Sequence, residues 1–272
     1  MTARNRLKPV LKLALPASTR RFLRVHAKRV WPPIGLVRFG SLRRPTPVSA
    51  RFGERGQAID RYYIERFLAR QAGQEDYVIG DVRGHVLEIG DGFYSRVYGR
   101  WGEPGSAIEK LDVLSADAAA PDATIVADLS QAGDIPSDTF DCIICTQTLL
   151  LIYDVRAAVR TLHRILRPGG VALVTIPGIS PICSPDIHLW GDYWRFTSLS
   201  ARRLFEEAFA AADVTVEAHG NVLAAVAFLH RLGAEELRPR ELDLHDPDYE
   251  LLITVRAVKG PRLEADPRAA PR

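Results

Sequence analysis

Short apolar runs alternate with longer helical patterns over most of this chain, and this alternation constrains its fold more than any other feature. Strands that alternate with helices form a mostly parallel sheet with helices on both faces. We therefore predict a single α/β domain, doubly wound, with a seven-stranded sheet. Strands are expected at residues 85–89, 108–111, 123–127, 140–145, 171–176, 213–218 and 250–258, and helices at residues 154–166, 199–211 and 222–237.

Basic residues are concentrated at the N-terminus. Residues 1–53 contain thirteen Lys and Arg and no Asp or Glu, whereas the other 219 residues hold 23 basic and 33 acidic side chains. We interpret residues 1–53 as a basic, partly disordered arm with one helix at 20–31 that Pro32-Pro33 ends. The main domain is expected at residues 54–258 and begins with a helix at 57–71. Residues 259–272 are charged and proline-broken, which predicts a disordered tail.

The composition excludes some classes of protein. No apolar stretch reaches the roughly 18 residues that a membrane-spanning helix needs. Prolines and lysines interrupt the apolar residues near the N-terminus, which argues against a signal peptide. The three cysteines, Cys142, Cys145 and Cys183, make no even disulfide framework. We therefore expect reduced thiols and a cytoplasmic protein.

Small and acidic residues follow four of the predicted strands. In open α/β sheets, ligands bind beyond the carboxyl ends of the strands, near the point where the strand order reverses. An acid after the second strand can accept hydrogen bonds from both ribose hydroxyls, and a side chain after the third can accept one from an adenine amine. Glycines after the first strand let the backbone approach a ligand closely. These positions hold Gly90-Asp91-Gly92, Asp112, Asp128 and Thr146-Gln147.

This pattern favours a nucleoside ligand that lacks phosphates. A dinucleotide fingerprint needs a third glycine at the position where Ser95 stands, and the glycine-lysine pattern of a P-loop is absent from the sequence.

Three segments carry a family resemblance: VLEIGDG (86–92), DTFDCIICTQTL (138–149) and LHRILRPGGVALVTIP (162–177). They resemble class I S-adenosylmethionine-dependent methyltransferases, over roughly residues 57–258. The resemblance implies a Rossmann-like fold and S-adenosylmethionine as the cofactor. IDRYYIERFLA (59–69) and GDYWRFTSLSARRLFEEAF (191–209) look like a subgroup often associated with glycan or glycosyltransferase genes.

The resemblance also implies roles for single residues. The first motif, against which the methionine end of the cofactor lies, is matched by Glu88, Gly90 and Gly92, although Tyr94 replaces the family's final glycine. Asp112 matches the ribose-binding acid, with Glu109 and Asp117 as alternatives. Asp128 matches the acid that faces the adenine, and Leu129 matches its apolar neighbour. Thr146 and Gln147 match the segment that lies under the cofactor.

A loop after the fifth strand, residues 177–197, contains the candidates for acceptor chemistry. Transfer of a methyl group to a hydroxyl needs a base that removes its proton. His188 is the first candidate and Asp192 the second. Acceptor contacts are expected from Trp190, Tyr193, Trp194 and Arg195, the tryptophans by stacking on a sugar or aromatic ring. The alternative is that these side chains only anchor the loop.

We therefore predict a metal-independent O-methyltransferase that acts on a sugar or glycan intermediate or on a specialised small metabolite. A catalytically inactive binding or scaffold protein with the same fold, and an RNA methyltransferase, are the alternatives. The acidic main domain makes nucleic acid an unfavourable partner. Arginines beside apolar residues in the arm favour a weak contact with anionic lipid at the inner face of the membrane. The apolar stretch 222–237 could cover the sheet or the acceptor pocket, or form a homodimer interface.

Overall fold

The computed structural model describes residues 37–73, 80–182 and 189–261. The chain divides into two compact units, Met1–Thr46 and Pro47–Arg272. The described part of the first unit contains one short 3-10 turn, η2 (Gly40–Leu42). The predicted helix at 20–31 lies outside the described residues.

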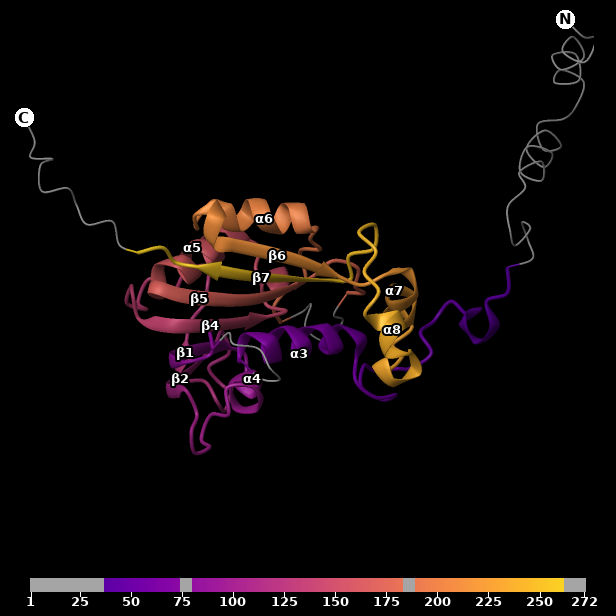
Figure 1. The fold of residues 1–272 in the computed structure, drawn as a ribbon, viewed down its shortest axis with the longest axis horizontal. Helices are drawn as coiled ribbons and strands as arrows, with labels where there is room; N and C mark the ends of the chain where they lie inside the picture. Colours follow the sequence, from indigo (N-terminus) through magenta and orange to yellow (C-terminus); the bar gives the residue numbers. More distant parts are fainter. Residues whose placement is uncertain (1–36, 74–79, 183–188, 262–272) are drawn as a thin grey trace, which may run out of the picture. The chain divides into compact units, whose positions relative to one another are not determined.

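The second unit is built on a seven-stranded sheet (Figure 1). The strand order is β3-β2-β1-β4-β5-β7-β6, and β7 runs antiparallel to both of its neighbours while the other pairs are parallel. This confirms the predicted Rossmann-like, doubly wound, mostly parallel sheet. The strands are β1 (Gly84–Ile89), β2 (Ile108–Ser115), β3 (Ile125–Val126), β4 (Phe140–Thr146), β5 (Leu166–Pro177), β6 (Val214–His219) and β7 (Leu252–Val258).

Helices cover both faces of the sheet (Figure 1). On one face α5 (Val155–Ile165) and α6 (Ser198–Glu206) bury apolar side chains against Leu87, Ile143 and Val174. The other face is covered by α3 (Ile59–Gln71) and α7 (Val222–Leu229), with the short helices α4 (Phe93–Val97) and α8 (Pro239–Leu242) beside them. Alternate residues of the central strands, such as Cys142 and Ile143, face the two sides, so both cores draw on the same strands.

Several element bounds differ from the prediction: β5 begins at Leu166 rather than at residue 171, β3 is confined to Ile125–Val126, and α6 ends at Glu206 rather than at residue 211. Strand β2 continues to Ser115 rather than ending at residue 111, because the buried pair Val113 and Leu114 extends its pairing with β1. Helix α7 ends at Leu229 rather than at residue 237. Its chain turns at Arg231, which has φ +57°, and continues extended through Gly233, which forms a β-bridge with Ala58.

The segment just before α3 is attached to the region after α7. The amide of Val48 donates to the His230 carbonyl at 3.0 Å, and the ring of Phe52 stacks on Phe228 with centroids 5.0 Å apart. The amide of Ala234 donates to the Gln57 carbonyl at 2.7 Å. These contacts fix the start of α3 at the carboxyl-end edge of the sheet.

Among the described residues, no helix combines the length and the apolar character that crossing a membrane requires.

Acid is expected to destabilise the protein through His219, the last residue of β6. Its ring stacks on Tyr63 at 5.7 Å, and its Nε2 lies 3.1 Å from Thr254 Oγ1. Burial lowers the pKa of His219 to about 4. The unfolded chain takes up this proton near pH 6.5 and the folded chain near pH 4, so stability falls as the pH drops through that window, by about 3 kcal/mol at most.

Urea unfolding of the wild type and of His219→Gln between pH 7.5 and pH 4 measures this contribution. The variant should lose less stability over the window than the wild type. An equal loss in both proteins would assign the acid sensitivity to other groups.

Candidate functional site

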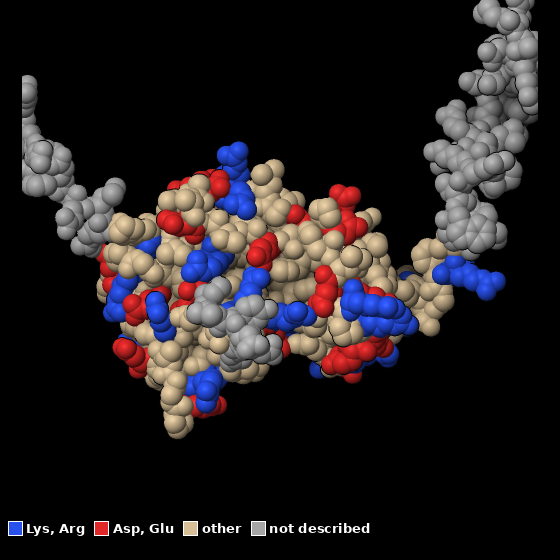
Figure 2. All heavy atoms as spheres, viewed as in Figure 1, with Lys and Arg blue, Asp and Glu red and all other residues tan. Residues whose placement is uncertain are grey.

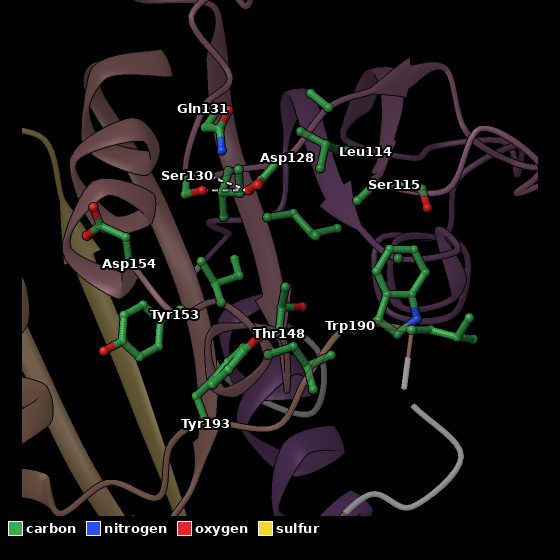
Figure 3. A pocket seen from close by; sticks show the side chains of 18 residues that line it. Leu114, Ser115, Asp128, Ser130, Gln131, Thr148, Tyr153, Asp154, Trp190 and Tyr193 are labelled. Carbon is green, nitrogen blue, oxygen red and sulfur yellow. Dashed lines mark hydrogen bonds between the residues drawn. The ribbon is translucent and has the colours of Figure 1, made fainter. Parts of the chain in front are cut away.

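A cavity of about 700 Å³ opens at the carboxyl ends of β1 to β4 (Figure 3). This volume suits a ligand of nucleoside size. Strand β1 contributes Ile89 and the adjoining Gly90, β2 contributes Leu114 and Ser115, and the segment after β3 contributes Asp128. The remaining lining residues are Ala116, Ala127, Leu129, Ser130, Gln131, Thr148, Leu151, Ile152, Tyr153, Asp154, Leu189, Trp190 and Tyr193.

The side chain of Glu88 fixes the glycine turn through hydrogen bonds to the backbone that follows it. Its carboxylate is buried, and its two oxygens accept hydrogen bonds from the backbone amides of Tyr94 (2.9 Å) and Ser95 (2.7 Å). Burial raises the pKa of Glu88, although these hydrogen bonds act in the opposite direction. The residue does not line the cavity. Its role is to fix the turn, whereas the resemblance had suggested direct contact with the cofactor.

The two glycines of the turn have different tasks. Gly90 lines the cavity with φ +125°, and a β-carbon built on it would meet nothing within 4 Å. Gly92 has φ +71°, and a β-carbon there would lie 3.0 Å from Val113 Cγ2. Gly90 therefore leaves room for a ligand, and Gly92 makes the sharp entry into α4 possible.

Tyr94, at the position of the missing third glycine, points away from the cavity. It is buried in the core beneath α3, and its ring lies 6.2 Å from that of Tyr98. Since its φ is not positive, the backbone here needs no glycine. The departure from the family pattern is thus accommodated in the core and leaves the cavity unchanged.

Asp128 is oriented by the residue two positions further on. Its Oδ1 accepts hydrogen bonds from both the amide and the hydroxyl of Ser130, each at 2.8 Å (Figure 3). No described residue bonds to Oδ2. The carboxylate lines the cavity beside Leu129, as expected for an acid that faces a ligand amine.

Asp112 lies where the prediction did not expect it. It sits inside β2, opposite Leu87 of β1, and its carboxylate contacts His85 Nε2 (2.7 Å), Lys110 Nζ (2.8 Å) and Thr124 Oγ1 (2.9 Å). Burial alone would raise the pKa of Asp112, but these partners together lower it. The residue does not line the cavity, because Leu114 and Ser115 occupy the strand end.

Of the two alternative acids, Asp117 lies closer to that strand end. It follows Ser115 and Ala116, and its Oδ1 accepts a hydrogen bond from the Ala119 amide at 2.8 Å. Glu109 is exposed near the start of β2. The end of β2 lies at Ser115 rather than at residue 111, so Asp112 is inside the strand and Asp117 is the nearer of the two alternative acids to the strand end.

Thr146 ends β4 and Gln147 follows it; neither lines the cavity, whereas the next residue, Thr148, does. Gln147 has φ +48°, and its amide donates to the Thr175 carbonyl at 2.9 Å. Its side-chain Nε2 is buried and has no hydrogen-bond partner among the described residues. The strand end thus carries an unsatisfied donor beside the cavity.

The loop after β5 brings aromatic residues to the cavity. Trp190 and Tyr193 line it, on the side away from Gln131 (Figure 3). Trp194 does not line it, and its Nε1 donates to the Ile152 carbonyl at 3.0 Å. Tyr153, 72% exposed, contacts Tyr193 edge-to-face at 5.3 Å and stacks on Trp194 at 6.0 Å. Together Tyr153, Tyr193 and Trp194 form an aromatic rim beside the cavity.

Asp192 and Arg195 anchor this loop. The Asp192 side chain is completely buried, and its Oδ2 accepts a hydrogen bond from Arg195 Nη2 at 3.0 Å. Arg195 also donates to the Pro181 carbonyl at 2.7 Å. Neither residue lines the cavity, so the geometry assigns them to loop structure and does not support Asp192 as a base or Arg195 as an acceptor contact. His188 lies outside the described residues.

Several lining residues were missed by the sequence analysis, chiefly Ser115, Ser130, Gln131, Tyr153 and Asp154. The signal for Ser115 was the apolar pair Val113-Leu114, which continues the strand. Asp154 caps α5 by accepting a hydrogen bond from the Ala157 amide at 3.0 Å, so its position before a helical pattern could have located it. No group of three or more His, Cys, Asp or Glu within the described ranges is placed to hold a metal ion.

Comparison with solved structures finds many chains of similar fold. A S-adenosylmethionine-dependent methyltransferase from Mesorhizobium loti shares 17% identity with a TM-score of 0.44, covering 71% of this chain and 97% of its own. An N-methyltransferase from Bradyrhizobium japonicum shares 14% identity with a TM-score of 0.45, covering 74% and 97%. A possible sarcosine dimethylglycine methyltransferase from Galdieria sulphuraria shares 14% identity with a TM-score of 0.48, covering 73% of this chain and 86% of its own. At these TM-scores the likenesses say nothing about the acceptor.

The sequence itself matches a family model. No curated protein matches the chain significantly. Residues 87–174, which run from β1 to β5 and include most of the cavity wall, match the model of a family described as a methyltransferase domain. The match spans the glycine turn, Asp128 and Thr148. Residues 87–174 therefore match a methyltransferase domain in sequence, and most of the residues that line the cavity lie within that match.

Proposed function

We propose that this enzyme transfers a methyl group to a hydroxyl of a sugar or glycan intermediate, or of a similarly polar small metabolite. The observation that carries the proposal is the aromatic rim of Tyr153, Tyr193 and Trp194. Flat aromatic faces that are partly exposed suit the apolar face of a sugar ring. The rim adjoins a cavity whose size and strand-end position suit the cofactor, so acceptor and donor would meet at one edge of the sheet.

The chain's own residues would act mainly by positioning. When bound, S-adenosylmethionine supplies a methyl group on a positively charged sulfur. In-line displacement would form the bond between the acceptor oxygen and the methyl carbon as the carbon–sulfur bond breaks, which would leave a neutral thioether, and the hydroxyl proton would pass to a base of the chain. His188 stays our proposed acceptor for that proton. Asp128 with Leu129 would orient the adenine, and Ser115, which lines the cavity at the end of β2, would bind the ribose.

The rim predicts a specific kinetic defect. Tyr153→Ala should raise KM for a sugar acceptor about tenfold with kcat little changed, because the lost contact is equally present in ground and transition states. The assay follows S-adenosylhomocysteine release from S-adenosylmethionine with a panel of nucleotide sugars and free monosaccharides. His188→Ala should instead lower kcat.

Two outcomes would refute this proposal. A wild type that binds S-adenosylhomocysteine but turns over RNA and not the sugars would favour the nucleic-acid alternative, and that activity should fall steeply with added salt. A wild type that does not bind S-adenosylhomocysteine would favour the scaffold alternative.

A further inference from the structure

Helix α7 is apolar on all sides, yet only one side of it is buried. Its sequence, VLAAVAFL, contains no polar residue. The side chains that pack in the core beside α3 are Ala224, Ala225, Ala227 and Phe228. The side chains that stay between 36% and 50% exposed are Val222, Leu223, Val226 and Leu229. A helix that is apolar all round is normally enclosed by protein or lipid. The described residues leave the outer side of α7 uncovered.

The exposed side chains form one continuous apolar face. At 100° per residue, positions 222, 223, 226 and 229 fall within about 120° of the helix circumference. The apolar surface continues past the start of the helix to Leu244, which is exposed. Asn221, the N-cap of α7, holds Leu244 there, because its side-chain amide donates to the Leu244 carbonyl at 2.7 Å. Contiguous exposed apolar surface of this kind marks a site of interaction with a protein or a membrane.

This apolar face lies at the edge of the sheet where the cavity opens. Helix α7 directly follows β6 and lies beyond its carboxyl end (Figure 1). Strands β6 and β4 point the same way and are three strand spacings apart, which is roughly 14 Å. A partner that covers α7 would therefore lie beside the edge at which the cavity opens.

The basic segment of the chain enters the second unit beside this face. The amide of Val48 donates to the carbonyl of His230, the residue after α7, at 3.0 Å. The guanidinium carbon of Arg231 lies 5.4 Å from the ring centroid of Phe52. Residues 218–234, which include α7, contain no Asp or Glu. The thirteen Lys and Arg of residues 1–53 are thus tethered at one end of an apolar face.

The rest of the second unit does not supply a positive surface. Residues 54–272 hold 23 basic and 33 acidic side chains, and Figure 2 shows the two kinds interspersed over the visible face. At the start of α7 stands an acid, Asp246, whose amide donates to the Gly220 carbonyl at 2.9 Å. Attraction to a negative partner would therefore come from residues 1–53, and apolar contact from α7. Reversible binding to an anionic bilayer combines these same two contributions.

A second copy of this chain fits the face less well. The face is one helix about 12 Å long. Four partly exposed aliphatic side chains cover far less than the roughly 800 Å² that each partner buries in a stable dimer. Two copies would also bring two wholly basic segments close together, and these repel each other.

We propose that α7 docks on an anionic membrane surface, with Val222, Leu223, Val226 and Leu229 in the interfacial region and residues 1–53 on the lipid headgroups. Weak apolar insertion and weak electrostatic attraction would act together, so that neither alone holds the protein firmly. The inference concerns a surface outside the cavity and stands whichever acceptor the enzyme uses.

Flotation of the full chain with vesicles tests the proposal. One set is phosphatidylcholine alone, and the other contains about 30% phosphatidylglycerol. The wild type should bind the anionic set more strongly, and added salt should weaken that binding. Leu223→Gln combined with Leu229→Gln should lower partition onto anionic vesicles about tenfold, because two inserted side chains become polar.

Two further variants make the test specific. Leu199→Gln combined with Val126→Gln alters two exposed aliphatic side chains on α6 and β3, and this matched control should bind like the wild type. Val222→Trp should strengthen binding, because tryptophan favours the membrane interface. Every replaced side chain is exposed, so urea unfolding should give the wild-type midpoint for each variant.

Four results would overturn the proposal. A wild type that binds neither set of vesicles has no membrane surface, and equal binding to both sets would remove the role of the basic segment. Wild-type binding by the α7 double variant would leave the basic segment alone responsible. A wild-type dimer in analytical ultracentrifugation that this variant dissociates would assign the face to a second copy.

Discussion

Glu88→Ala is expected to abolish measurable binding of S-adenosylhomocysteine and to lower the free energy of unfolding by about 3 kcal/mol. The carboxylate is 1% exposed and satisfies two backbone amides, those of Tyr94 and Ser95. Alanine would leave both buried donors without a partner and open a small cavity beneath the turn. The turn carries Gly90 into the cavity wall, so its loosening should cost binding as well as stability.

Glu88→Gln separates the two effects. Glutamine is nearly the same size and keeps one acceptor oxygen, but its amide group would face a second amide donor. We expect an intermediate loss in both measurements. Urea unfolding gives the stability and calorimetric titration gives the affinity. Glu109→Ala, which removes an exposed glutamate of β2, is the control and should change neither.

If Glu88→Ala lost stability yet bound S-adenosylhomocysteine normally, the turn would not be part of the cofactor site. Normal stability would contradict the role of the carboxylate in satisfying the backbone.

The fold could be predicted because its signal is spread over many residues. Seven apolar runs with helical patterns between them constrain a doubly wound sheet, and an error of a few residues at one strand end does not alter the topology. The site depends on single positions. Asp112 was assigned to a strand end because it follows Ile108–Leu111, but Val113 and Leu114 carry the strand past it. The predicted strand end therefore decided which acid was proposed to bind the ribose.

Contacts between distant segments were also beyond the sequence pattern. In the sequence Asp192 is one acid in a polar loop. Its burial in an ion pair with Arg195 depends on the folded loop, in which Arg195 also donates a hydrogen bond to the Pro181 carbonyl. In the same way, Arg61 is separated from Phe93 by more than thirty positions in the chain and meets it through the packing of α3. Neither spacing nor periodicity encodes such pairs.

Gly90→Ala tests whether the space in the turn belongs to a ligand. Both Gly90, at φ +125°, and Gly102, at φ +87°, have backbone conformations that alanine adopts with strain, and a β-carbon on either would meet nothing within 4 Å. We expect alanine at each position to lower stability by about 1–3 kcal/mol. Only Gly90 lines the cavity, so only Gly90→Ala should weaken binding of S-adenosylhomocysteine. The expected loss is 100-fold or more, which corresponds to about 3 kcal/mol.

The comparison between the two variants decides the interpretation, because both glycines have a positive φ and open space where a β-carbon would lie. Calorimetric titration at a temperature where both variants are folded removes the contribution of unfolding. A loss confined to Gly90→Ala would mean that the empty space beside the turn is occupied by the ligand. Similar losses in both variants would trace the defect to general destabilisation. Unchanged binding in Gly90→Ala would mean that the ligand does not occupy the space beside Gly90 and lies elsewhere in the cavity.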